Sequence, residues 1–219
     1  MQLASLLCVG VLLAGLLQIS LPWIQLKRLF GWRWKFSMEN SHEISQLKSL
    51  FWVGLLGAAV AQLNILVSRL FAYTLEGSGG MSYLFISSRL IELPLGVFAI
   101  SIATVWFPAM ANAKAKGDEQ NFWRKALGGL RLTTSISIPA AIGLAFLGES
   151  TLIALFRWGE FGDAEVSGSA EILRIYCLGL PFYAVSTFLV KIFHSEKNMK
   201  IPVQGAMISL VLNVILSLV

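Results

Sequence analysis

Long apolar runs alternate with short polar segments along the chain, and this pattern predicts six helices that cross a membrane. A helix needs about 20 apolar residues to cross the hydrocarbon core of a bilayer, and its own hydrogen bonds satisfy its backbone there. Runs of suitable length occupy residues 3–24, 50–75, 82–111, 132–156, 172–193 and 201–219. We therefore expect an all-α fold, a polytopic bundle of transmembrane helices.

The polar segments between these runs differ in charge, and the difference predicts an orientation. The first, third and fifth connections are rich in Lys and Arg, whereas residues 76–80 and 159–169 contain neither. Because Lys and Arg concentrate in cytoplasmic loops, we expect the three basic connections inside, with the first run crossing from outside to inside. The basic residues are Lys27, Arg28, Arg33, Lys35 and Lys48, then Lys114, Lys116, Arg124 and Lys125, then Lys191, Lys197 and Lys200.

The composition of the chain agrees with a membrane setting. Of its 219 residues, 56% are hydrophobic and 13% are charged, which is too apolar for a surface that faces water. A net charge of +5 could indicate nucleic-acid binding, but the basic residues are concentrated in short connections, as membrane topology requires. The basic and aromatic segment 30–49 likewise favours a membrane-interface belt over a base-stacking surface. Cys8 and Cys177 lie in separate apolar runs, and we interpret them as small packing residues.

No arrangement of residues in the sequence indicates an enzyme. There is no phosphate-binding glycine loop, no pair of His at metal-ligand spacing and no nucleophile elbow. We therefore expect no catalytic residue, no metal and no cofactor. The first run lacks the basic start and the cleavage site of a signal peptide, and the last run reaches the final residue. We expect both ends to be cuts through a longer protein.

Arg69, Arg89 and Glu92 are the informative charged side chains within the predicted spans. A charge at the middle of a span costs about 2.5–3.5 kcal/mol on insertion scales, so such groups normally face a protein interior or an aqueous cavity. Arg89 and Glu92 lie three residues apart, on one helical face. They could form an ion pair that locks this helix to its neighbours, or a cationic wall for an anionic substrate. Arg69 lies near the outer end of its span and could reach Glu76 as a boundary anchor.

Helix-breaking and polar residues add two further expectations. Pro94 and Gly96 follow the charged pair directly, and Pro94 removes the backbone donor to Leu90 and crowds that carbonyl. We expect a kink there, which is either static or a moving hinge. Gln62 and Asn64 lie near the middle of the second run, where side-chain amides usually hydrogen-bond to another helix.

Three motifs, in the same order along the chain, resemble those of one transporter family. Residues 87–98 (SSRLIELPLGVF) and 103–108 (ATVWFP) resemble the signature helix of the MurJ (MviN) lipid II flippase family. Residues 155–162 (LFRWGEFG) are similar to that family's outside loop, and residues 179–181 and 201–203 resemble its next helix and inner turn. This resemblance covers essentially the whole chain. The family belongs to the superfamily of MATE-type exporters and polysaccharide flippases.

The resemblance implies a fold and a function. Members have two six-helix lobes around a central cavity, followed by an extra helix pair. Residues 1–26 would be the last helix of the first lobe, residues 27–49 a cytoplasmic linker, and residues 50–219 the first five helices of the second lobe. The resemblance further implies translocation of lipid II, an undecaprenyl-diphosphate-linked muropeptide, across the bacterial cytoplasmic (inner) membrane by alternating access. Such transport serves peptidoglycan synthesis, cell-wall biogenesis and cell shape.

The same resemblance implies which residues meet the substrate. The family's signature-helix arginine lies in a cationic cavity and handles the diphosphate, a role that would fall to Arg89 with Glu92 beside it. Arg69 is a further candidate, although it stands where many members have a smaller or acidic residue. The inner turn 197–201 (KNMKI) also departs from the family's usual version. Because the other cavity arginines belong to helices absent here, we expect no transport by this chain alone. A membrane potential or a coupling ion would supply the driving force.

Two rival functions remain open at this stage. The first is a related exporter of another lipid-linked glycan or of a cationic drug, although a cationic drug would prefer an acidic lining. The second is a membrane scaffold that transports nothing and whose charges serve packing only.

Overall fold

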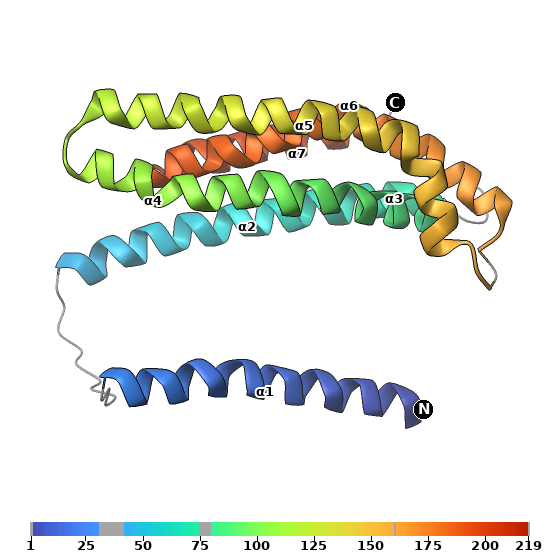
Figure 1. Ribbon diagram of the computed structural model, residues 1–219, viewed down its shortest axis with the longest axis horizontal. Coiled ribbons are helices and arrows are strands. Elements are labelled where there is room, and N and C mark those ends of the chain that lie inside the picture. The colour runs from blue at the N-terminus through green and yellow to red at the C-terminus, as the bar shows by residue number, and fades with distance from the viewer. Residues whose placement is uncertain (1, 31–41, 75–79, 160, 219) are drawn as a thin grey trace. The chain divides into compact units, whose positions relative to one another are not determined.

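The computed structural model describes residues 2–30, 42–74, 80–159 and 161–218, and those residues contain helices and turns but no strand (Figure 1). The prediction of an all-α fold is confirmed. The chain divides into two units, Met1–Ser45 and Gln46–Val219. The helices are α1 (Gln2–Phe30), α2 (His42–Thr74), α3 (Gly80–Pro94), the π-helix η1 (Leu95–Ile100), α4 (Ser101–Ala115), α5 (Glu119–Phe156), α6 (Asp163–Ser195) and α7 (Lys200–Ser217).

Six stretches of helix in the described residues are long and apolar enough to cross a membrane, as the hydropathy pattern predicts. They are Val9–Leu29, Phe51–Tyr73, Gly80–Ala115, Glu119–Phe156, Asp163–Ser195 and Lys200–Ser217. The third of these combines α3, η1 and α4 in one continuous helical path.

Helices α5 and α6 begin earlier than hydropathy predicts, because polar caps rather than apolar residues start them. Helix α5 starts 13 residues before the apolar run at residue 132, where the backbone N–H of Asn121 donates to Asp118 Oδ1 at 3.0 Å. Helix α6 starts at Asp163, where the N–H of Gly162 donates to Glu165 Oε2 at 2.8 Å. Of the basic residues that hydropathy assigns to the loop before residue 132, Arg124 and Lys125 therefore lie in the first two turns of α5, whereas Lys114 lies at the end of α4.

Helices α3 to α6 share the core of the second unit. Around α5 and α6, three clusters of buried side chains follow one another. One end of the bundle is filled by Ala103, Met110, Ala113, Phe122, Ala126, Phe188 and Ile192. Toward the other end lie Ile91, Ala141 and Leu180, and then Leu90, Leu152, Val166, Ala170, Leu173 and Cys177. Cys177 is therefore a buried packing residue, as expected.

Polar side chains connect α2 to α7. The Asn213 side-chain amide donates to Asn64 Oδ1 and to Ser68 Oγ, the latter at 2.8 Å. A Cβ at Gly57 would lie 2.9 Å from Val203 Cγ2, so the two helices also approach closely. The prediction that Asn64 bonds to another helix is confirmed.

Two of the three basic connections lie at the same end of the second unit. Lys114, at the end of α4, forms an ion pair with Glu196, which caps α6, at 2.9 Å. This contact joins the α4–α5 turn to the α6–α7 turn, which is the arrangement that alternating basic loops require.

Candidate functional site

Helix α3 has one buried face, and this face fixes where the rest of the helix points. Ser87, Leu90 and Ile91 are buried, and Ser87 Oγ donates to the backbone carbonyl of Ser169 on α6 at 2.7 Å. Small hydroxyl residues allow two helices to approach closely in a membrane. Because α3 packs through this face, its opposite face is left uncovered by the second unit.

The uncovered face of α3 carries the charged pair that sequence spacing singles out. Arg89 Nη1 lies 2.8 Å from Glu92 Oε2, and each side chain is 56% exposed. The guanidinium carbon of Arg89 also lies 4.9 Å from the centroid of the Phe85 ring, one turn earlier. The ion pair is thus present, but it joins two residues of α3 and no second helix among the described residues.

A half-exposed charged pair on an apolar helix needs a polar environment. Arg and Glu are rarely found facing lipid within a span, because hydrocarbon offers no compensating hydrogen bonds. The ion pair compensates one guanidinium nitrogen only. This face of α3 therefore suits contact with water, with an anionic ligand or with other polar protein groups.

The backbone changes character immediately after the charged pair. Pro94 ends α3, and Leu95–Ile100 form a π-helix before α4 continues the same path. Wide turns of this kind are rare and are often found at functional sites. A Cβ at Gly96 would meet nothing within 4 Å, so packing does not require a glycine there. The π-helix lies where the kink is expected, whereas the kink itself, static or moving, stays a prediction.

The remaining sequence candidate, Arg69, lies on another helix. It is exposed on the last third of α2, and its predicted partner Glu76 lies outside the described residues. Within the ranges that the structure describes, no group of three or more His, Cys, Asp or Glu side chains is placed to hold a metal ion.

Two ion pairs between residues far apart in the sequence escaped sequence reasoning. Arg174 on α6 donates to Glu149 on α5 at 3.0 Å, and Lys114 on α4 contacts Glu196 at 2.9 Å. The partners of the first pair are 25 residues apart, and Lys114 and Glu196 are 82 apart. No local spacing rule could have found them.

Comparison with known proteins agrees with the motifs. The sequence model of the family described as "Lipid II flippase MurJ" matches residues 1–219. The probable lipid II flippase MurJ of Vibrio cholerae is 32% identical over 216 residues, which is 96% of this chain and 40% of the relative. That of Bdellovibrio bacteriovorus is 32% identical over 214 residues, 95% of this chain and 40% of the relative.

A solved structure is also similar. It is titled "Lipid II flippase MurJ, inward closed conformation", and it superimposes with a TM-score of 0.70 at 28% identity over 89% of this chain and 40% of the solved chain. This chain thus spans about 40% of the length of the relatives that it matches. The family model matches residues 1–219, six helices in the described part of the chain are long and apolar enough to cross a membrane, and the relatives are bacterial. The chain therefore belongs to the lipid II flippase MurJ family and is a multi-pass protein of the bacterial cytoplasmic membrane.

Proposed function

We propose that this chain takes part in the translocation of lipid II, an undecaprenyl-diphosphate-linked muropeptide, across the cytoplasmic membrane by alternating access. The names of its relatives support this substrate. The observation that carries the proposal is the half-exposed Arg89–Glu92 pair on the uncovered face of α3. A charged face within a span is suited to a polar pathway and poorly suited to lipid.

Arg89 suits the diphosphate of such a substrate. A guanidinium is planar, remains charged when partly desolvated, and can donate parallel hydrogen bonds to phosphate oxygens. Glu92 accepts from Nη1, which holds the side chain beside the Phe85 ring and leaves Nη2 and Nε for a ligand. Glu92 is therefore proposed to orient Arg89. Arg69 is a further candidate for contact with the substrate.

The proposed transport requires more protein than this chain. In the proposed arrangement, residues 1–26 form the last helix of a first lobe, residues 27–49 a cytoplasmic linker, and residues 50–219 the first five helices of a second lobe. The exposed face of α3 would then line the cavity between the lobes. Pro94 and Gly96 would let the α3 half of this path bend against the α4 half, and a membrane potential or an ion gradient would drive the cycle.

The test replaces Arg89 in the complete encoded protein, expressed in a bacterium depleted of its own lipid II flippase. Arg89→Ala is expected to abolish rescue of growth while the protein remains in the membrane at the parental amount. Loss of two charge-assisted hydrogen bonds, each worth about 1.5–3 kcal/mol, would weaken binding of the diphosphate by at least about a hundredfold.

The matched control is Arg124→Ala. Arg124 also contacts a residue three positions away on its own helix, since its Nη2 donates to Asn121 Oδ1 at 3.0 Å, but it lies near the start of α5. We expect normal rescue by this control. Normal rescue by Arg89→Ala would refute the proposed role, and normal lipid II transport by that variant in vesicles would favour the scaffold interpretation of the charged pair.

A further inference from the structure

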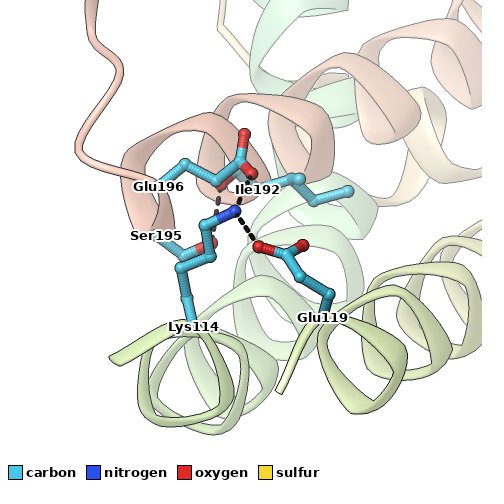
Figure 2. A network of polar contacts seen from close by, with 5 residues as sticks. All are labelled: Lys114, Glu119, Ile192, Ser195 and Glu196. Atoms are coloured by element: carbon cyan, nitrogen blue, oxygen red, sulfur yellow. Dashed lines mark hydrogen bonds and ion pairs between the residues drawn. The ribbon is translucent and has the colours of Figure 1, made fainter. Parts of the chain in front are cut away.

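The ends of three helices meet around one lysine at the basic end of the second unit. Figure 2 shows Lys114 of α4 reaching between Glu119, in the first turn of α5, and Glu196, at the end of α6. The Lys114 ammonium lies 2.7 Å from Glu119 Oε1 and 2.9 Å from Glu196 Oε1. It also lies 5.2 Å from the centroid of the Phe122 ring, which is fully buried. One cation therefore contacts all three helices.

The two arms of this contact differ in reach and in exposure. Glu119 is five residues from Lys114 and its side chain is 57% exposed, so this arm is local and well hydrated. Glu196 is 82 residues away and its side chain is only 24% exposed. Ion pairs lose less of their strength to solvent when they are partly buried. The arm to Glu196 is therefore the one that can couple distant parts of the chain.

The two turns that Lys114 joins have the same backbone design. In the α4–α5 turn, the N–H of Asp118 donates to the Ala113 carbonyl at 3.0 Å, and Gly117 has φ 72°. In the α6–α7 turn, the N–H of Asn198 donates to the Phe193 carbonyl at 3.0 Å, and Lys197 has φ 60°. Both turns close a helix with a left-handed residue, a position that favours glycine.

The left-handed backbone of Lys197 destabilises the α6–α7 turn, so this turn depends on contacts with other parts of the protein. A residue with a side chain costs about 1–2 kcal/mol in this conformation relative to a right-handed one. Glu196 immediately precedes Lys197, and α7 begins three residues later at Lys200. An anchor on Glu196 therefore helps to hold the direction in which α7 leaves the turn.

We propose that Lys114 is a positioning residue of the transport cycle, which fastens the α4–α5 turn to the α6–α7 turn so that both move as one piece. This inference rests on the proposed function for its role in transport, but the coupling of the turns does not. Lys191 of α6 adds a second link, because its ammonium lies 6.0 Å from the centroid of the Phe107 ring on α4. The start of α7 then follows every movement of α4 and α5.

Lys114 acts at a distance from the charged pair on α3. It lies 22 positions beyond Glu92 on the same helical path, which is about 33 Å at 1.5 Å per residue. A substrate diphosphate at Arg89 cannot touch it. Loss of the contact between Lys114 and Glu196 should therefore slow the conformational steps of transport and leave the affinity for lipid II unchanged.

The first experiment measures amide hydrogen exchange in the complete encoded protein in lipid nanodiscs. Lys114→Met keeps the length of the side chain and removes its charge, and Glu196→Gln removes the other end of the long arm. Both are expected to speed exchange at the Lys197 and Asn198 amides about two- to fivefold, because the turn opens more often. Lys114→Arg, which keeps the charge, and Lys116→Met, which removes an exposed lysine in the same turn, should match the parent.

Unchanged exchange at Lys197 and Asn198 in both Lys114→Met and Glu196→Gln would overturn the coupling. The second experiment compares the rate of lipid II transport at saturating substrate with the affinity for lipid II. We expect a lower rate at parental affinity for Lys114→Met, with recovery in Lys114→Arg. A parental rate despite faster exchange would overturn the role in transport. Failure of the parent itself to transport would remove that role together with the proposed function, and the exchange comparison would still decide the coupling.

Discussion

The contact between Gly129 of α5 and Phe188 of α6 provides a sensitive test of how tightly these helices pack. A Cβ at residue 129 would lie 2.2 Å from Phe188 Cζ and 2.7 Å from its Cε2, well inside van der Waals contact. The Phe188 ring is fully buried in the cluster that also holds Phe122 and Ile192, so it has no free space into which to turn. Gly129→Ala must therefore push the two helices apart or force the ring out of its rotamer.

The expected cost follows from two opposing terms. Overpacking of a well-packed core usually costs about 1–3 kcal/mol. Replacing a helical Gly by Ala returns up to about 1 kcal/mol of helix propensity. The net expectation for Gly129→Ala is a loss of about 1–2 kcal/mol in the free energy of unfolding, a factor of roughly 5–30 in the unfolding equilibrium.

The assay is reversible unfolding in mixed micelles, followed by helical circular dichroism and Trp fluorescence. Gly143→Ala is the matched control, because Gly143 lies on the same helix and a Cβ there would meet nothing within 4 Å. This control should be as stable as the parent or slightly more stable. Gly129→Ala should cost less free energy of unfolding in a Phe188→Leu background than in the parent, because the ring that clashes is removed. Equal stability of Gly129→Ala and Gly143→Ala would refute the packing argument.

Two further predictions use the turns and the π-helix. Lys197→Gly should raise the free energy of unfolding by about 1 kcal/mol, because it removes a side chain from a residue with a left-handed backbone. Gly117→Ala, at the equivalent position of the other turn, should lower the free energy of unfolding by about as much. The same unfolding assay checks both, and the opposite signs would contradict the turn assignment. Gly96→Ala should leave the unfolding curve close to that of the parent, since a Cβ there meets open space, but should slow lipid II transport if η1 must bend. Parental transport by Gly96→Ala would count against a hinge.

Sequence alone determined the properties that depend on neighbouring residues. The length of each apolar run predicts six spans, because the thickness of the bilayer sets the number of residues needed. The spacing of Arg89 and Glu92 predicts that they share a helical face and can interact, and the structure shows their ion pair. Pro94 and Gly96 predict a kink, and η1 begins directly after Pro94. Motif resemblance identified the family, because motifs are read directly from the residues.

Tertiary structure decided the properties that depend on distant residues. Asn64 is a polar residue in a span by sequence, but its partner Asn213 is 149 residues away and is found only when α2 and α7 pack together. Lys114 reads as one basic loop residue among several, yet its position opposite Glu196 makes it a link between two turns.

The uncovered face of α3 is likewise a result of packing, since the burial of Ser87 against α6 decides which way Arg89 points. Helical periodicity shows which residues of α3 share a face, but it does not show which face packs against a neighbouring helix. Only the neighbouring helices select the one that is buried.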